Sequence, residues 1–275
     1  TDRNGFCIFI GTPKGRNNFY EMYEMAKKDP AWYTRLFKAS ETGIVPQEEL
    51  AALRNEMGDD AFEQEFECSF TAAVKGTYYS KKITELENKP VPQITTVPYD
   101  PALGVITAWD LGIGDSLVVW FAQRHYREVR IIDYMEMNSM DEGLSSVVRE
   151  LNKKPYAYTT HILPHDAAVR DLGTGKSRIE TLRGLGLKGI EVLPRMKVED
   201  GINAVRNLLP MCWFDAVNCH RGLECLREYR REWDEKMQIF KDKPLHDQYS
   251  HGADGFRYLA LGIDRERPLN QPQRQ

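Results

Sequence analysis

Two short apolar runs, each leading into an aspartate, constrain the fold of this chain more than any other feature. Residues 104–109 (Gly-Val-Ile-Thr-Ala-Trp) run directly into Asp110, and residues 158–163 (Tyr-Thr-Thr-His-Ile-Leu) lead through a Pro-His pair into Asp166. Short runs that are rich in apolar and β-branched residues are typical of buried strands. We therefore expect both aspartates at the ends of interior strands, where their carboxylates can meet.

A third aspartate, Asp254, lies in a segment whose pattern predicts a helix. Residues 246–259 are helical in pattern, and in such a helix Asp247, His251 and Asp254 would share one face at positions i, i+4 and i+7. The segment also contains two glycines, Gly252 and Gly255, beside that face. Because a glycine carries no side chain, this helix could pack closely against a sheet.

Carboxylates that converge from three segments indicate a site for a divalent cation. Mg²⁺ and Mn²⁺ prefer oxygen ligands. Two such ions about 3.5–4 Å apart stabilise both the attacking and the leaving oxygen when a phosphodiester is displaced in line. For any one of these residues the alternative is a cap of a helix or turn, a common position for Asp. Their joint placement favours a metal-dependent phosphodiesterase.

Three segments resemble the nuclease domain of the large terminase subunits of tailed bacteriophages. They are residues 108–116, 164–167 and 246–258. In addition, residues 9–20 (Phe-Ile-Gly-Thr-Pro-Lys-Gly-Arg-Asn-Asn-Phe-Tyr) resemble the motif that couples ATP hydrolysis to movement in the terminase ATPase domain. Each motif is short and degenerate, so their order and spacing carry the specificity. The resemblance extends from residue 6 to about residue 262.

The resemblance implies a ribonuclease-H-like α/β fold, with a mixed sheet flanked by helices, that cuts concatemeric double-stranded DNA during genome packaging. The family's three catalytic, metal-binding acids would fall on Asp110, Asp166 and Asp254, which would hold one or two Mg²⁺ or Mn²⁺ ions. Asp115 would either turn back to the metals or stabilise the turn that contains it. Hydrolysis by this mechanism leaves a 5′-phosphate and a 3′-hydroxyl. The implied partners are DNA, the portal protein and the small terminase subunit, in the cytoplasm of a bacterial host.

The N-terminal part resembles only the end of an ATPase domain. Gly11 and Thr12 would belong to the coupling segment. The sequence Gly-Thr-Gly-Lys-Ser at 173–177 is not a phosphate-binding loop, because the full motif requires a glycine where this chain has Arg170. We therefore expect no ATPase activity from this chain, and we expect the ATPase core to precede residue 1.

Several basic residues are candidates for contact with DNA phosphates, although a solvated turn is the alternative for the first two. They are Lys176, Arg178, Arg195 and Lys197. A second basic strip alternates with glutamates, a pattern more typical of a salt-bridged helix surface: Arg221, Arg227, Arg230 and Arg231. The net charge of −4 argues against a protein that coats DNA through bulk electrostatics.

The pattern of elements predicts three parts: residues 1–89 as the end of an ATPase domain and a linker, 90–263 as the nuclease domain, and 264–275 as a disordered tail. In the first part we expect a strand at 6–10, a helix that begins at Pro46, and packing by Phe62, Phe66 and Phe70 at helical spacing. In the second part we expect an antiparallel meander of strands near 103–110, 116–123 and 128–136, helices near 140–153, 177–185, 198–209 and 218–232, and strands near 158–163 and 190–193. Strands followed by alternating elements favour a mixed α/β sheet.

Composition excludes some classes and leaves two alternatives open. The 5 cysteines contain no Cys-x-x-Cys pair, so neither a zinc site nor a disulfide framework is indicated. No run reaches the roughly 20 apolar residues of a membrane span. A resolvase or transposase with the same fold would use the same acids. A non-catalytic docking module for the portal or the small terminase subunit would show no metal dependence and would tolerate loss of Asp110.

Overall fold

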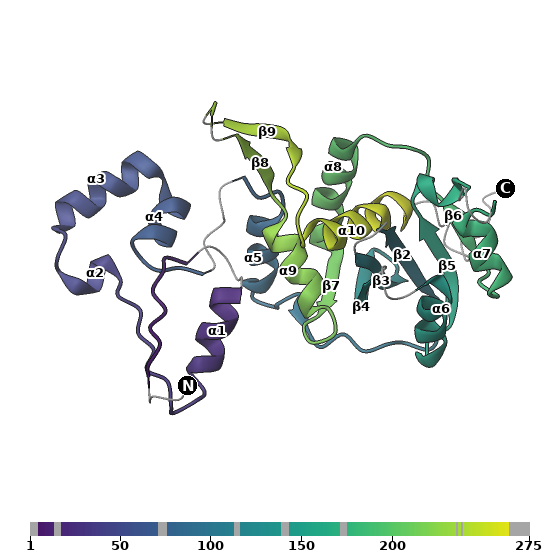
Figure 1. Ribbon diagram of the computed structural model, residues 1–275, viewed down its shortest axis with the longest axis horizontal. Coiled ribbons are helices and arrows are strands. Elements are labelled where there is room, and N and C mark those ends of the chain that lie inside the picture. Colours follow the sequence, from purple (N-terminus) through teal and green to yellow (C-terminus); the bar gives the residue numbers. More distant parts are fainter. Residues whose placement is uncertain are drawn as a thin grey trace.

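The computed structural model describes residues 5–13, 18–70, 76–112, 116–138, 143–170, 175–234, 236–237 and 239–263, apart from the side chain of Asp60. Four helices from the N-terminal part lie at one side of the molecule, and a large sheet with its covering helices lies at the other (Figure 1). The tail predicted at 264–275 falls outside the described residues.

The N-terminal part consists of short helices: α1 (Asn18–Ala26), α2 (Ala39–Thr42), α3 (Gln47–Met57) and α4 (Asp59–Glu65). The helix expected after Pro46 is therefore confirmed. The expected single stripe of phenylalanines is wrong, because α4 ends before Phe66. Phe62 and Phe66 stack on each other, whereas Phe70 packs against aromatic rings of α1, at 5.1 Å from Tyr20 and 5.6 Å from Tyr23 between ring centroids.

The apolar run at 6–10 does not form the strand that its composition predicts. It has no regular secondary structure, and Phe6 and Ile10 are almost fully exposed. A strand needs a neighbouring strand for its backbone hydrogen bonds, and none of the described strands pairs with these residues.

The sheet has seven strands among the described residues, in the order β1-β7-β4-β3-β2-β5-β6. They are β1 (Ile94–Thr95), β2 (Val105–Leu111), β3 (Ser116–His125), β4 (Glu128–Asn138), β5 (Tyr158–Leu163), β6 (Ile190–Val192) and β7 (Cys212–Asp215). β3 runs antiparallel to both of its neighbours, and every other pair is parallel. The predictions of an antiparallel meander and of a mixed α/β sheet flanked by helices are confirmed.

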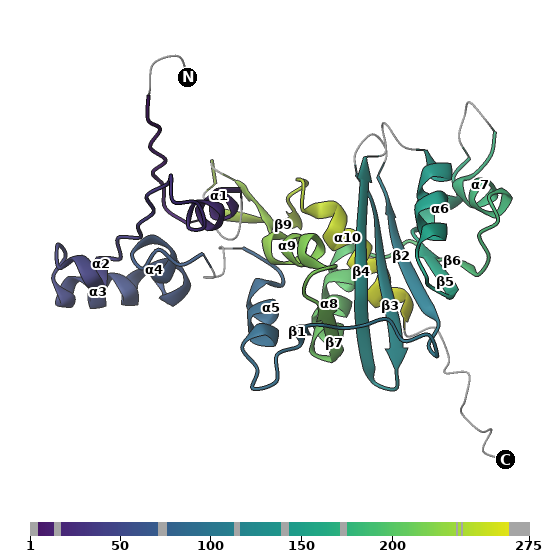
Figure 2. The ribbon, with the colours of Figure 1, turned by 90° about the horizontal axis from the view of Figure 1, so that it is seen from below.

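Helices cover both faces of the sheet, so its strands are apolar on both sides. They are α5 (Ser80–Glu87), α6 (Leu144–Lys153), α7 (Arg178–Gly184), α8 (Val198–Leu208), α9 (His220–Glu228) and α10 (Ser250–Gly262), with single 3₁₀ turns η1 (His165–Ala168) and η2 (Leu209–Met211). Figure 2 shows α9 and α10 on one side of the sheet and α6 and α7 on the other. Trp120 of β3 lies in the core under α8, α9 and α10, and its neighbour Phe121 lies in the core under α6 and α7.

The helix expected at 218–232 ends at Glu228. Beyond it the backbone becomes extended and bonds to an earlier segment: the N–H of Tyr78 donates to the carbonyl of Tyr229 at 2.9 Å, and that of Arg231 donates to the carbonyl of Gly76 at 2.9 Å. A hairpin follows, made of β8 (Arg231–Asp234) and β9 (Ile239–Pro244). Pairing with a distant segment therefore replaces the last turn of the predicted helix.

Helix α5, which the sequence assigned to the first part of the chain, packs into the core of the sheet. Tyr79, Ile83 and Leu86 are buried in the same cluster as residues of β4 and α9. The boundary at residue 89 stays a prediction, but this packing favours a limit near residue 76. In the part of the chain that the structure describes, no helix has both the length and the apolar character needed to cross a membrane.

Candidate metal centre

Parallel pairing brings Asp110 and Asp166 to one edge of the sheet. β2 and β5 are parallel neighbours, with Ala108 opposite Ile162. Asp110 lies near the carboxyl end of β2, and Asp166 follows β5 in the turn η1. Ligand sites in sheets of this kind form at the carboxyl ends of strands, which is the placement that the sequence predicts.

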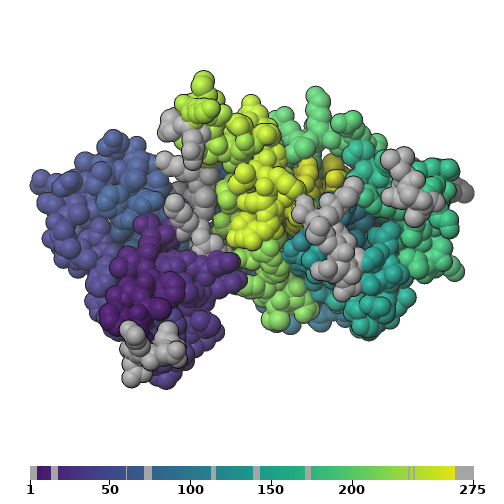
Figure 3. Space-filling view, viewed as in Figure 1, coloured from purple at the N-terminus to yellow at the C-terminus, as the bar shows by residue number. Residues whose placement is uncertain are grey.

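Asp254 reaches the same region from α10, which packs directly on β2 and β3. Gly255 makes this approach possible: a Cβ there would lie 3.2 Å from the Trp120 ring and 3.3 Å from Val118. Figure 3 shows α10, in yellow, partly exposed on this face of the molecule.

The expectation that Asp247 shares a helix face with Asp254 is wrong. α10 begins only at Ser250, and Asp247 lies in the turn before it. One oxygen of Asp247 accepts the N–H of Tyr249 at 3.0 Å, and the other lies 3.2 Å from a guanidinium nitrogen of Arg230. Its carboxylate therefore stabilises the turn, a frequent role for Asp.

Asp110 is bonded to a side chain of α10. The His251 ring donates from Nδ1 to Asp110 Oδ2 at 3.0 Å. Burial raises the pKa of Asp110, and the neighbouring Asp254 carboxylate raises it further, while the hydrogen bond from His251 opposes the increase. A nearby positive charge would favour the ionised form of this carboxyl.

Asp166 has one oxygen that is buried and lacks any partner in the described part of the chain. This atom is Oδ1. The other oxygen, Oδ2, lies 3.7 Å from Nη1 of Arg178. A buried carboxylate oxygen without a hydrogen bond is costly and rare in folded proteins, so this atom suits a ligand to a cation.

Asp254 is anchored through a single oxygen. Oδ1 accepts from the Tyr229 hydroxyl at 3.0 Å and from Arg257 Nε at 3.1 Å, and Arg257 Nη2 forms an ion pair with it at 2.8 Å. Its second oxygen, Oδ2, has no hydrogen-bond or ion-pair partner among the described residues.

The three aspartates therefore share one pattern, in which one oxygen has a hydrogen-bond or ion-pair partner and the other has none among the described residues. After burial, the charges of Asp110, Asp254 and Asp166 raise the pKa of Tyr258, so all three carboxylates act on this one side chain. Oxygen donors of this kind fit a hard divalent cation. Over the described ranges, however, no three His, Cys, Asp or Glu side chains lie close enough together to hold one ion. Asp115 lies outside the described residues.

The sheet and its helices are similar to those of solved phage proteins. The large terminase of a thermophilic bacteriophage, in its crystal form 3, matches 92% of this chain and 61% of its own, with a TM-score of 0.53 and 17% identity. Crystal form 2 of the same protein matches 92% of this chain and 60% of its own, with a TM-score of 0.52 and 15% identity. This chain has the fold of a phage large terminase. The expected mixed α/β sheet flanked by helices agrees with this fold.

The likeness to large terminases concerns the fold, because the identities are low. The chain spans about three fifths of the length of the solved terminase that it matches. No protein-family model and no curated protein matches the sequence.

The residues that the sequence predicts to contact DNA lie at the same edge of the sheet as the aspartates. Arg195 and Lys197 are exposed and lie between β6 and α8. Because β6 is parallel to β5, they follow the same edge of the sheet as Asp166. Arg178 pairs with Asp166, and Lys176 is exposed just before α7. Their contact with DNA stays a prediction.

The predicted coupling residues, Gly11 and Thr12, are exposed and lie in a segment without regular structure. Their role stays a prediction, and residues 14–17 of the same motif lie outside the described residues.

Sequence reasoning missed two residues that anchor Asp254. Arg257 lies three positions beyond Asp254 on the same helix, a spacing at which helical side chains meet, so the signal was present. Tyr229 lies 25 positions away on another element, and no local pattern links it to Asp254.

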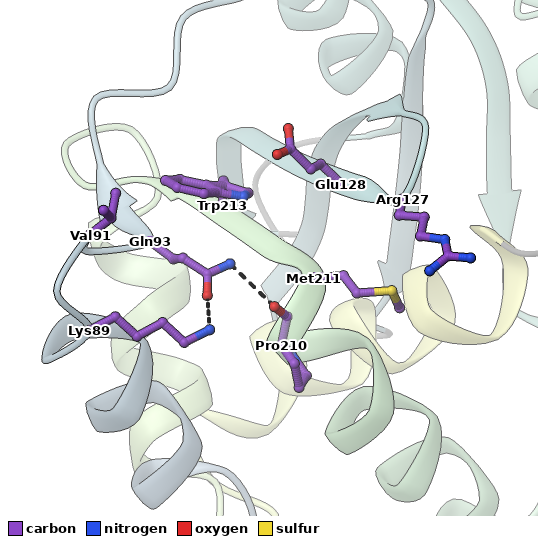
Figure 4. A pocket seen from close by; sticks show the side chains of 8 residues that line it. All are labelled: Lys89, Val91, Gln93, Arg127, Glu128, Pro210, Met211 and Trp213. Atoms are coloured by element: carbon purple, nitrogen blue, oxygen red, sulfur yellow. Dashed lines mark hydrogen bonds between the residues drawn. The ribbon is translucent and has the colours of Figure 1, made fainter.

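A pocket of about 400 Å³ lies away from this edge (Figure 4). Its lining includes Arg127, which precedes β4, and Trp213, which is near the start of β7. Gln93 also lines the pocket, and its Nε2 donates to the carbonyl of Cys212 at 2.9 Å. Since β4 and β7 run in the same direction as β2, the pocket lies at the edge opposite to Asp110 and is separate from the candidate centre.

Proposed function

We propose that this chain is a metal-dependent DNA endonuclease of a viral genome-packaging motor, which cuts concatemeric double-stranded DNA by phosphodiester hydrolysis. One observation carries the proposal. In a large-terminase fold, Asp110, Asp166 and Asp254 come to one region of the sheet edge, and each keeps one oxygen without a described partner while the other is anchored.

These three residues would hold one or two Mg²⁺ or Mn²⁺ ions. Bound ions of this class stabilise charge on the attacking and leaving oxygens of a phosphodiester. The chain itself prepares the ligands: His251 orients Asp110, Arg178 lies beside Asp166, and Arg257 with Tyr229 orients Asp254. Outer-shell bonds of this kind fix ligand geometry and are important for affinity.

The remaining assignments belong to the same proposal. The basic residues at the sheet edge would meet DNA phosphates: Lys176, Arg178, Arg195 and Lys197. Gly11 and Thr12 would couple the nuclease to a motor. The portal protein and the small terminase subunit would be partners in the host bacterial cytoplasm. The similarity to a large terminase supports these roles.

The proposal is tested by conversion of supercoiled plasmid to nicked and linear forms with Mn²⁺, Mg²⁺ or EDTA. The unsubstituted chain should cut only with metal, and Asp110→Asn and Asp166→Asn should not cut. Asp200→Asn, which changes an exposed carboxylate in the first turn of α8, should cut normally. Absence of cutting at every metal concentration, together with no calorimetric binding of Mn²⁺, would instead support a docking module.

A further inference from the structure

Tyr229 is buried, and its hydroxyl forms a hydrogen bond with Asp254. It follows α9, its exposed fraction is 1%, and its hydroxyl donates to Asp254 Oδ1 at 3.0 Å. The ring stacks on Tyr79 with 5.7 Å between centroids and an interplanar angle of 17°. Tyr78 packs against it on another side, at 5.2 Å. The ring therefore has little freedom to move.

The backbone of Tyr229 is fixed as well. Its N–H donates to the carbonyl of Cys225 at 3.0 Å, and its carbonyl accepts from the N–H of Tyr78 at 2.9 Å. The position and direction of the hydroxyl are thus set by α9 and by the segment that leads into α5.

All anchoring donors meet the same oxygen of Asp254. The hydroxyl of Tyr229 and Nε of Arg257 donate to Oδ1, and Nη2 of Arg257 forms an ion pair with the same oxygen, while Oδ2 has no partner among the described residues. Two hydrogen bonds and an ion pair on one oxygen restrain the carboxylate and leave the second oxygen as the better metal ligand, since its lone pairs are available.

Tyr79 provides a natural contrast on the neighbouring ring. Its exposed fraction is also 1%, and its ring stacks on that of Tyr229. Its hydroxyl, however, is buried and has no hydrogen-bond partner in the described ranges. The two residues therefore differ in the bond to Asp254.

We propose that Tyr229 is a positioning residue that, together with Arg257, fixes Asp254 so that Oδ2 is presented to the divalent cation. This inference rests on the proposed nuclease function, because it requires Asp254 to be a metal ligand. Tyr229 touches that ligand and does not itself touch DNA.

The test measures Mn²⁺ binding by calorimetry on the full 275-residue chain, together with kcat and KM for plasmid cutting. Tyr229→Phe should weaken Mn²⁺ binding about 10-fold, the usual cost of losing an outer-shell partner, and lower kcat while leaving KM for DNA unchanged. Tyr79→Phe removes the same atom from a neighbouring ring and should match the unsubstituted chain in all three quantities.

A double substitution separates positioning from a general structural effect. If Tyr229 acts through Asp254, Tyr229→Phe should weaken Mn²⁺ binding no further when Asp254→Asn is already present. Equal Mn²⁺ affinity in Tyr229→Phe and Tyr79→Phe, a full additional loss in the double variant, or an unfolded Tyr229→Phe chain would each overturn the positioning role and leave the nuclease proposal standing. No Mn²⁺ binding by the unsubstituted chain would overturn both.

Discussion

At the scale of single residues, Asp166 has a partly exposed side chain in which one carboxylate oxygen is buried and lacks a partner among the described residues. Removing such a group from an apo protein relieves the cost of keeping it out of water. Oδ1 of Asp166 is in this situation among the described residues, with Arg178 near the other oxygen only. The buried oxygen of Asp166 therefore lowers the free energy of unfolding without metal, while it is available for the proposed role as a metal ligand.

We expect Asp166→Ala to raise the free energy of unfolding in EDTA by on the order of 1 kcal/mol and to abolish the increase in Tm that Mn²⁺ causes. Urea denaturation in EDTA and thermal unfolding with Mn²⁺ measure the two effects. Asp200→Asn should keep the full response of Tm to Mn²⁺. A normal response in Asp166→Ala would show that this carboxylate holds no metal.

His161 is a second informative residue, on the opposite face of the sheet from α10. Its Nδ1 lies 2.6 Å from the hydroxyl oxygen of Thr107, and Trp109 Nε1 donates to that oxygen at 2.7 Å. The Thr107 hydroxyl therefore donates to the ring, which is neutral. Burial lowers the pKa of His161 from 6.5 to about 4.

Because the folded pKa lies below the unfolded one, the unfolded state binds more protons between these two values. The contribution of neutral His161 to the free energy of unfolding is fully present above pH 6.5 and is lost as the pH falls towards about 4. The maximal loss is about 3 kcal/mol. Urea unfolding at several pH values should show a steeper loss for the unsubstituted chain than for His161→Gln, which can still accept from Thr107. Parallel curves would contradict this prediction.

At the scale of elements, glycines decide how closely the helices approach the sheet. A Cβ on Gly222 of α9 would lie 2.3 Å from the ring of Trp120 and 2.7 Å from that of Tyr134, both in the core. Gly184, at the end of α7, has open space around it. The same change should therefore have opposite effects at these two positions.

Gly222→Ala should lower the free energy of unfolding by about 1–3 kcal/mol, because the core must shift to admit the methyl group. Gly184→Ala should be neutral or stabilising by up to about 1 kcal/mol. Chemical denaturation of both variants measures the difference. Equal stability of the two would mean that α9 can move away from the sheet without cost.

The loop between β6 and α8 is the element on which the proposed DNA contacts can be tested. Arg195→Ala and Lys197→Ala together should reduce the slope of log affinity against log salt by about 0.9 for each phosphate that the protein no longer neutralises. Arg127→Ala, at the opposite edge of the sheet beside the pocket of Figure 4, should leave the slope unchanged. Filter binding in EDTA at several salt concentrations measures the slopes. Unchanged slopes in the double variant would remove these residues from the DNA interface.

At the scale of the whole molecule, α5 packs into the core of the sheet and contributes to its stability. Its N-cap residue Tyr79 and its residues Ile83 and Leu86 are buried in the core, and full burial of a large apolar side chain contributes roughly 1.5–3 kcal/mol. A chain that starts at residue 76 should therefore unfold cooperatively with near-native stability, whereas one that starts at residue 90 should be strongly destabilised. Circular dichroism and urea denaturation of the two truncations measure this. Equal stability would support the limit at residue 89.

Local patterns in the sequence were sufficient for the main strands and for the placement of the candidate ligands. The runs before Asp110 and Asp166 are short and rich in apolar and β-branched residues because both faces of the sheet are buried, and such runs are visible without knowledge of their neighbours. The helices α6, α7 and α8 were equally visible, because each buries one regular face.

Only the tertiary structure decided the rest, because those features depend on pairing between distant segments. β1 and β7 are 2 and 4 residues long and exist through their pairing with each other and with β4. The end of α9 is set by bonds to residues 76–78, and the same pairing holds Tyr229 where its hydroxyl meets Asp254. The sequence by itself thus determined which carboxylates reach the edge of the sheet. Folding determined which oxygen of Asp110 and Asp254 has a partner, because His251 and Tyr229 reach these oxygens from other elements of the chain.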